Sequence, residues 1–304
     1  MANKIKILPG TPDDNNREYL PEAIKGSDIV VNENGNNSLP YPKKLQEFHE
    51  IMGNDTPDTW YEYVPECYDP SRKTPLVLAM HGGLMTGWGQ AVYTSWTLVA
   101  ERDNIIVVFP NAHSRRLWTL EATEVELKVD SQLPDEIKQN LASNDENPDI
   151  KFILALLEYL KGKYNIDEER IFMQGMSNGN MFTSQFARYF GDKLTAVSGA
   201  GGGTPNPRLL YKNGKLINHA GPIGMWISIP EKNGCPPWCE FDDLTIYKYT
   251  RVYWNELNGC KTDPEISIVG EHAFAFYKGE KADNVFLEIK NRDHGQTLDE
   301  AALV

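Results

Sequence analysis

Apolar runs and helical patterns alternate along the chain from about residue 60 onward. The runs PLVLAM (75–80) and IIVVF (105–109) contain no charged position, which is typical of strands buried on both faces of a parallel sheet. The stretch 150–164 instead places apolar residues three and four positions apart, which predicts a helix with one buried face. The predicted strands are 60–64, 75–80, 105–109, 171–174, 194–200, 223–229 and 285–289, with a hairpin over 265–269 and 273–277. The predicted helices are 90–101, 150–164, 178–189 and 243–257.

This alternation predicts the α/β class, with a mostly parallel central sheet and helices on both faces. Residues 60–304 are expected to form one domain, with a long acidic insertion at about 112–149 that would act as a loop or lid. Residues 1–59 are rich in Asn, Asp, Pro and Gly, and we interpret them as a partly irregular N-terminal extension. Short strands are expected there at best, near 5–8 and 28–31. Since ligands bind such sheets beyond the carboxyl ends of the strands, those ends are where a site is sought.

The composition narrows the range of partners. The 304 residues are 40% hydrophobic and 24% charged, with a formal net charge of −13. Such an acidic protein disfavours nucleic acid and anionic membranes and suits a neutral substrate. No apolar run approaches the 18 or more residues of a membrane span. The start, MANKIKILPG, shows no signal peptide. The cellular location therefore stays open, and an extracellular location would require that a leader had been removed. The oligomeric state stays open too.

The four cysteines, Cys67, Cys235, Cys239 and Cys260, favour neither a metal site nor a fixed disulfide pattern. The stretch CPPWC lacks the two-residue spacing of a zinc knuckle and has no nearby His pair. We therefore expect no metal and no cofactor. A disulfide in an exported protein and four free thiols remain the two alternatives.

The stretch Gly175-Met176-Ser177-Asn178-Gly179 is a G-x-S-x-G match at the step from a predicted buried strand to a predicted helix. This is the context of a nucleophile elbow, in which a sharp turn lifts a serine hydroxyl above the sheet. The glycines leave room for the facing strand and helix. The alternative is that Ser177 only caps the helix and that the glycines ease packing.

A serine nucleophile needs a base and an orienting acid. His294 follows the last predicted core strand, which fits the chain order serine, acid, histidine; His113 is the reserve base. The acid is expected after the strand 223–229, where Glu231 stands. Asp242 and Asp243 are the alternatives, although they are also well explained as helix caps.

The oxyanion hole needs two backbone N–H groups. One is expected from Asn178, the residue after the nucleophile. The other is expected from the HGGL turn after the strand 75–80, where Gly83 or Leu84 is the donor. The alternative is that the glycines only form a tight strand-to-helix turn, and the two interpretations can hold together.

Several aromatic residues are candidates for the substrate wall. Trp118 follows the carboxyl end of a predicted strand, and Trp88, Trp226 and His113 lie in or near other predicted turns and strands. For each tryptophan, packing in the core is the alternative, and it is the more common one.

With these residues assembled, the chain resembles the polyhydroxybutyrate depolymerase-like esterases, relatives of feruloyl and acetylxylan esterases with the α/β-hydrolase fold. The resemblance runs from about residue 60 to His294 and rests on five stretches. They are YVPECYDPSRKTPLVLAMHGG, NIIVVFPNA followed by Trp118, DIKFILALLEYLKGKYNIDEERIFMQGMSNGNMF, YWNELNGC and the DHG near the end. It implies a catalytic domain over 60–304 that hydrolyses a small or polymeric carboxylic ester with Ser177, His294 and Glu231, without cofactor or metal.

The chain departs from that family in three places. Asn180 stands where the family usually has a second glycine, and ISIPE replaces the usual ending of the acid's strand. Only ten residues follow His294. Two alternatives to an esterase stay open: a non-catalytic binding protein with a degraded acid position, and a serine peptidase on the same fold.

Overall fold

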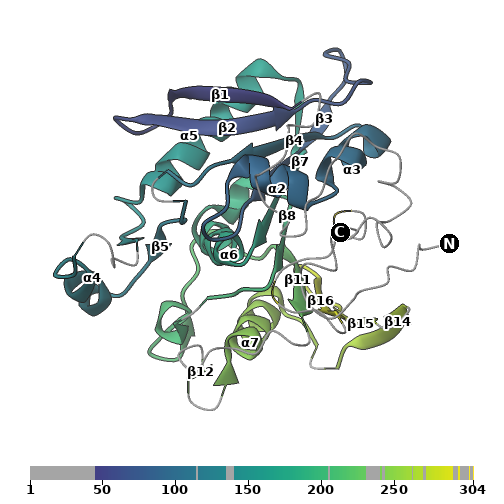
Figure 1. Ribbon diagram of the computed structural model, residues 1–304. Coiled ribbons are helices and arrows are strands. Elements are labelled where there is room, and N and C mark those ends of the chain that lie inside the picture. The colour runs from purple at the N-terminus through teal and green to yellow at the C-terminus, as the bar shows by residue number, and fades with distance from the viewer. Residues whose placement is uncertain are drawn as a thin grey trace.

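The computed structural model describes residues 45–113, 116–134, 140–204, 206–230, 240–241, 244–261, 263–269 and 272–289, together with 294, 301 and 304. One sheet runs through this part of the chain in the order β1-β2-β4-β3-β7-β8-β11-β16-β15-β14 (Figure 1). Its strands are β1 (Gln46–Ile51), β2 (Pro57–Tyr63), β3 (Thr74–Met80), β4 (Ile106–Pro110), β7 (Ile166–Met176), β8 (Ala196–Ala200), β11 (Gly224–Pro230), β14 (Glu265–Val269), β15 (His272–Tyr277) and β16 (Asn284–Ile289).

The helices are α2 (Gly87–Tyr93), α3 (Trp96–Asp103), α4 (Glu124–Asp130), α5 (Pro148–Lys163), α6 (Asn178–Phe190) and α7 (Ile246–Asn258). Short 3-10 turns, η2 (Gly191–Lys193) and η3 (Pro207–Leu209), follow α6 and β8. The remaining strands form two-stranded pairs: β5 (Leu120–Glu121) with β6 (Leu141–Ala142), β9 (Tyr211–Lys212) with β10 (Lys215–Leu216), and β12 (Glu240–Phe241) with β13 (Leu244–Thr245).

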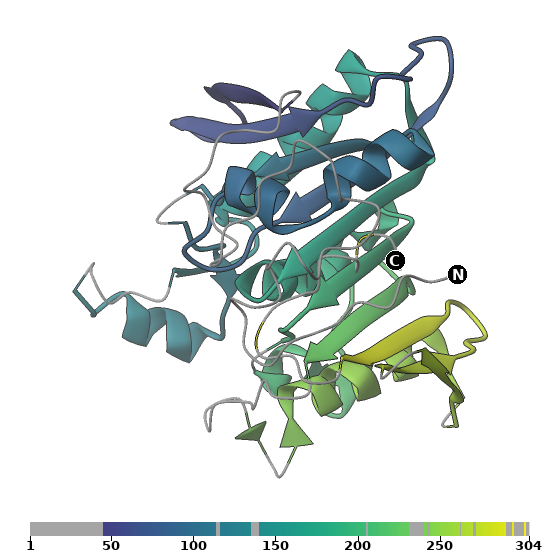
Figure 2. The same ribbon diagram turned by 45° about the vertical axis from the view of Figure 1, so that its right-hand side comes forward.

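The centre of the sheet is parallel, as the apolar runs predict. Neighbouring strands from β4 through β3, β7, β8 and β11 to β16 are parallel, while both margins of the sheet pair antiparallel. Figure 2 shows the strands in succession from purple β1 at one edge to the yellow hairpin at the other. The predicted hairpin is confirmed, because β14 and β15 pair antiparallel.

Two layers of helix cover the sheet and bury its strands on both faces. Helices α5, α6 and α7 contribute to the larger core, in which Phe152, Phe182 and Trp254 are fully buried. Helices α2 and α3 cover the other face through Trp88 and Trp96. The predicted arrangement of helices on both faces of a mostly parallel sheet is therefore confirmed.

The structure differs from the predicted elements in three main places. The helix predicted over 243–257 begins at Ile246, because residues 244–245 form strand β13. The single helix predicted over 90–101 is two helices, because the chain becomes extended at Thr94, whose hydroxyl donates to the Gln90 carbonyl (2.8 Å). Strand β1 lies within the stretch predicted as irregular. Its residues are exposed apart from the half-buried Phe48, so the sequence shows no apolar run there. The predicted strands near 5–8 and 28–31 lie outside the described residues.

The acidic insertion carries β5, β6 and α4, and α4 stands away from the sheet in Figures 1 and 2. Helix α4 starts with a capping box between Thr123 and Glu126, and Glu126 Oε1 accepts from Asn206 Nδ2 (2.8 Å). In β5, Glu121 pairs with the buried Arg188 of α6. The insertion is thus anchored to α6, the helix that begins directly after Ser177.

Candidate active site

Ser177 occupies the sharp turn between β7 and α6. Its φ of 55° and ψ of −117° lie in a region that side-chain-bearing residues rarely adopt. Its N–H donates to the Ala200 carbonyl at 2.7 Å, so the turn is fixed to the end of the neighbouring strand β8. A strained serine between a buried strand and a helix is the geometry expected of a nucleophile elbow.

Glycine is required on both sides of this serine. A Cβ on Gly175 would lie 2.6 Å from the Asn180 nitrogen, and one on Gly179 would lie 2.6 Å from the Met80 carbonyl oxygen. Both contacts are with backbone, which cannot give way without moving β3 or α6. The two glycines therefore let the helix start close against the sheet and keep the serine hydroxyl raised.

His294 is brought to the serine from the far end of the chain. Its Nε2 lies 2.6 Å from Ser177 Oγ, although 117 positions separate the two residues. This is hydrogen-bond distance, at which an imidazole can accept the hydroxyl proton as general base. The predicted acids Glu231, Asp242 and Asp243 lie outside the described residues.

The HGGL turn and the loop around Trp118 lie against the elbow. The Trp118 N–H donates to Asn178 Oδ1 at 2.7 Å, and Trp118 Nε1 donates to the His81 carbonyl at 2.8 Å. The Leu84 N–H donates to the Arg116 carbonyl at 2.8 Å. Because the Leu84 N–H is already engaged, Gly83 is the better placed of the two predicted donors from this turn. The N–H of Asn178 lies in the first turn of α6, where helix N–H groups lack partners within the helix.

Comparison with known proteins places this geometry in context. No family model matches the chain. The chain is 27% identical over 155 residues to feruloyl esterase B from Thermothelomyces thermophilus, which covers 50% of this chain and 46% of that protein. It is 24% identical over 182 residues to a probable acetylxylan esterase A from Neosartorya fischeri, covering 59% of this chain and 42% of that one. The chain thus spans less than half the length of these curated relatives.

The solved structure of an acetyl xylan esterase from Aspergillus awamori superposes with a TM-score of 0.59 at 16% identity, covering 85% of this chain and 96% of that chain. Together with the parallel sheet and its two helical layers, this likeness decides the fold. The chain has the α/β-hydrolase fold. The predicted resemblance to feruloyl and acetylxylan esterases is confirmed at the level of sequence similarity.

In this α/β-hydrolase fold, His113 is part of a hydrogen-bonded group that is separate from the Ser177–His294 contact. Its Nδ1 lies 2.6 Å from Oδ1 of the buried Asp58, and its Nε2 lies 3.2 Å from Thr56 Oγ1. The backbone N–H of His113 donates to Asp149 Oδ1 at 2.6 Å. These contacts join the loop after β4 to the β1–β2 turn and to α5. His113, the reserve base and candidate substrate contact, therefore joins these three segments through its hydrogen bonds. The imidazole within hydrogen-bond distance of Ser177 is that of His294.

The tryptophans predicted for the substrate wall pack inside the protein. Trp118 is fully buried, and its ring stacks on Phe182 with centroids 4.8 Å apart. Trp88 is buried in the core under α2. Trp118 thus links Asn178 to the HGGL turn through its two hydrogen bonds. Core packing, the common alternative, applies to Trp118 and to Trp88.

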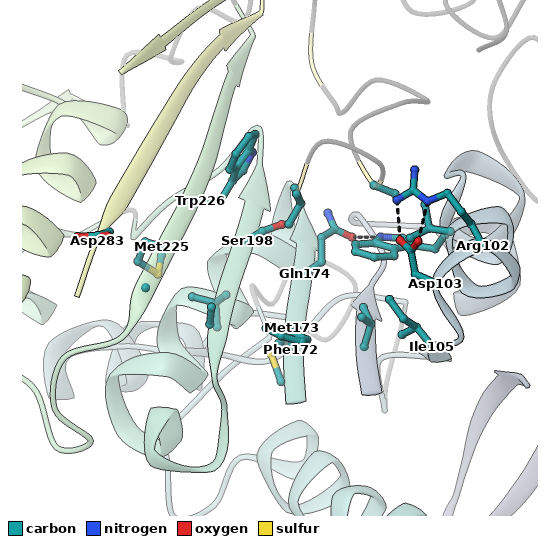
Figure 3. Close-up of a pocket in the computed structure, with 18 residues that line it drawn as sticks. Arg102, Asp103, Ile105, Phe172, Met173, Gln174, Ser198, Met225, Trp226 and Asp283 are labelled. Atoms are coloured by element: carbon teal, nitrogen blue, oxygen red, sulfur yellow. Dashed lines mark hydrogen bonds and ion pairs between the residues drawn. The ribbon is translucent and has the colours of Figure 1, made fainter. Parts of the chain in front are cut away.

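Trp226 belongs to a cavity of about 520 Å3 on the α3 side of β7, β8 and β11 (Figure 3). Gln174 and Ser198 also face this cavity, and Gln174 Oε1 accepts from Trp96 Nε1 at 3.3 Å. The described residues that line the cavity do not include Ser177. The cavity is therefore separate from the described part of the elbow site.

Asn180 contacts the glycine-rich run 199–203, which its place in the sequence does not predict. Its side-chain amide donates to the Gly202 carbonyl at 2.8 Å, and it occupies the space directly over Gly199. A Cβ at Gly202 would lie 2.6 Å from the Ser177 carbonyl oxygen. The run GAGGG (199–203) was the signal, because consecutive glycines after a strand indicate a close approach of backbone.

His81, the first residue of the HGGL turn, is fully buried. Its Nδ1 lies 2.7 Å from the Gly82 carbonyl oxygen, and its Nε2 accepts the Ala112 N–H at 2.9 Å. Complete burial lowers the pKa of its imidazole to about 4. The neutral ring joins the HGGL turn to Ala112 in the loop after β4.

The pH dependence of stability should report this buried imidazole. Since its pKa is about 4 when folded and near 6.5 when unfolded, the unfolded chain takes up the proton first as the pH falls. The contribution is fully present above pH 6.5 and is lost toward pH 4, by about 2 kcal/mol between pH 7 and pH 5. Urea unfolding of the wild type and of His81→Gln at both pH values measures it. An equal decrease for the two proteins would refute the assignment.

The structure also bears on the cysteines, on metal binding and on membrane spans. Cys67 and Cys260 are free thiols, and Cys235 and Cys239 lie outside the described residues. Among the residues that the structure describes, no three His, Cys, Asp or Glu side chains are grouped to hold a metal ion. None of the helices in that same part of the chain is long and apolar enough to span a membrane.

Proposed function

We propose that this protein is a serine esterase that hydrolyses carboxylic esters through an acyl-enzyme. The observation that carries the proposal is the 2.6 Å approach of His294 Nε2 to Ser177 Oγ in a strained strand-to-helix turn. The similarity to feruloyl and acetylxylan esterases supports the same reaction class. It favours a substrate with a feruloyl or acetyl group on a sugar, with a short polyester as a further candidate.

The reaction follows from the positions of these groups. Ser177 Oγ attacks the ester carbonyl carbon while His294 Nε2 takes the hydroxyl proton. The negative oxygen of the tetrahedral intermediate is stabilised by the N–H groups of Asn178 and Gly83. His294 then gives the proton to the leaving alkoxide, and the C–O bond breaks to leave an acyl-serine. Water repeats the sequence, with His294 as base, and releases the acid.

Pre-steady-state hydrolysis of p-nitrophenyl acetate tests this proposal. An acyl-enzyme predicts a burst of p-nitrophenol equal to the concentration of active sites, followed by slower turnover. The matched p-nitroanilide measures the amidase rate and separates an esterase from a peptidase. Absence of ester hydrolysis by the folded protein would instead favour a non-catalytic binding protein.

The proposed triad acid has a test of its own. Glu231→Gln is expected to lower kcat by at least about a hundredfold, because the neutral amide cannot stabilise the imidazolium of His294. Asp242→Asn and Asp243→Asn are the matched controls and should leave kcat nearly unchanged. Since α7 begins at Ile246, neither aspartate directly precedes the helix, and no loss of a helix cap is expected. If the aspartate changes abolish turnover and Glu231→Gln does not, the acid is one of the aspartates.

A further inference from the structure

Backbone strain in the described chain concentrates around the elbow. The non-glycine residues with positive φ in this part of the chain are Leu84, Asn104, Arg116, Asn140, Ser177 and Asn213. Asparagine tolerates this conformation, but leucine, arginine and serine do so at a cost of roughly 1 kcal/mol or more. Glycine at Leu84 or Arg116 would avoid that cost. The side chains kept there in spite of the strain are therefore candidates for function.

Leu84 and Arg116 form one strained pair beside the elbow. The Leu84 N–H donates to the Arg116 carbonyl at 2.8 Å. A Cβ placed on Gly83, the neighbour of Leu84, would lie 3.5 Å from Asn178 Cβ and 3.1 Å from Leu117 Cδ2. Each member of the pair is thus adjacent in sequence to a residue that lies close to the elbow or to the oxyanion turn. We therefore place the backbone of the pair beside the candidate site, one residue away from the groups that contact Asn178 and the HGGL turn.

Both side chains of the pair project into solvent. Leu84 is 65% exposed, and Arg116 is exposed as well. Arg116 Nε donates to the Met85 carbonyl at 3.2 Å, which fixes one edge of the planar guanidinium. Within the described residues, no carboxylate pairs with Arg116, and its only side-chain hydrogen bond is the one from Nε, which leaves the Nη pair for a ligand. A guanidinium held in this way presents two parallel donors, the arrangement that binds a carboxylate bidentately.

We propose that Arg116 binds a carboxylate carried by the ester substrate, so that the site selects esters with an anionic group close to the scissile bond. The inference rests on the proposed esterase function. A chain with a net charge of −13 repels anions in general, so one oriented guanidinium beside the candidate site supplies the local attraction that such a substrate requires. Leu84 lies beside it and offers an apolar surface to the carbon chain between carboxylate and ester.

Two pairs of esters, one releasing p-nitrophenol and one followed by ultraviolet absorbance, test the inference. The first pair, mono-p-nitrophenyl glutarate and p-nitrophenyl pentanoate, differs by a carboxylate on the acyl side. The second pair, 4-acetoxybenzoate and 4-methylphenyl acetate, differs by a carboxylate on the alcohol side. For each pair, the measured quantity is kcat/KM of the anionic ester divided by kcat/KM of the neutral ester. In the pair whose carboxylate reaches Arg116, Arg116→Gly should lower this ratio by about 10- to 100-fold, the range of a charged hydrogen bond. Arg116→Lys should keep part of the ratio, since it retains the charge and loses the fork.

Arg116→Gly suits the backbone, because its φ of 57° costs glycine nothing, so the variant is expected to fold with unchanged or higher Tm. Arg72→Gln is the charge-matched control, since Arg72 lies before the start of β3, at the opposite end of that strand from the HGGL turn. An unchanged ratio for Arg116→Gly in both ester pairs, or an equal fall for Arg72→Gln, would overturn the inference. Failure of the wild type to hydrolyse any of the four esters would instead count against the esterase function.

Discussion

Replacement of Ser177 by alanine should reduce ester turnover by about four to six orders of magnitude while leaving the fold intact. The substitution removes the only atom that attacks the ester, and the residual rate comes from the oxyanion hole and substrate binding. Alanine keeps the Cβ and so keeps the strained φ of 55°, which means that the free energy of unfolding should hardly change. Initial rates with p-nitrophenyl acetate, together with urea unfolding, measure both quantities.

Ser177→Gly provides the matched control for strain. Glycine adopts positive φ freely, so this variant should be more stable than the wild type by up to about 1 kcal/mol, and equally inactive. Such a result would show that stability is given up at this position to present the hydroxyl. Wild-type turnover by the alanine variant would mean that Ser177 is not the nucleophile.

Replacement of His294 by glutamine should have the second large effect. Glutamine cannot accept the hydroxyl proton at neutral pH, so kcat should fall by about three to six orders of magnitude. His294 is exposed, and its removal should cost little stability. Measurement of kcat and Tm on the same preparation separates the catalytic loss from unfolding.

The double variant Ser177→Ala/His294→Gln sharpens this second prediction. Because the two residues act as one unit across a 2.6 Å contact, removal of both should cost no more than removal of the more important one. Losses that multiply would show that the two side chains act independently, contrary to the proposed mechanism.

The fold was predictable because each buried strand carries its own local signal. Strands β3, β4 and β11 carry no charged residue, and the apolar residues of α5 recur with helical period. Strand β1 carried no such signal, since an exposed edge strand needs no apolar face. The break between α2 and α3 lies at Thr94, where the backbone becomes extended, and no periodicity reveals it.

The contact between Ser177 and His294 was predictable for a different reason. Gly175, Ser177 and Gly179 form a local motif, and His294 follows from chain order, so neither needs tertiary information. The roles of the surrounding residues were not predictable in this way. Whether Trp118 faces a substrate or the core depends on Phe182, which lies 64 positions further along the chain.

Arg116 shows the limit of the sequence most clearly. Nothing in the letters around it indicates a left-handed conformation or a bond from Leu84 to its carbonyl. Both depend on how the loop after β4 meets the HGGL turn, which is a property of tertiary packing. The acid stays a prediction from chain order, since Glu231 lies outside the described residues.

Covalent labelling with a fluorophosphonate probe is the most direct test of the central claim that His294 activates the Ser177 hydroxyl. Mass spectrometry of the digested, natively labelled protein should find one adduct, on Ser177, formed at a rate that falls by at least about a hundredfold in His294→Gln. An adduct on a different residue would contradict the account. So would the absence of any adduct on the folded wild type, or a labelling rate that His294→Gln leaves unchanged.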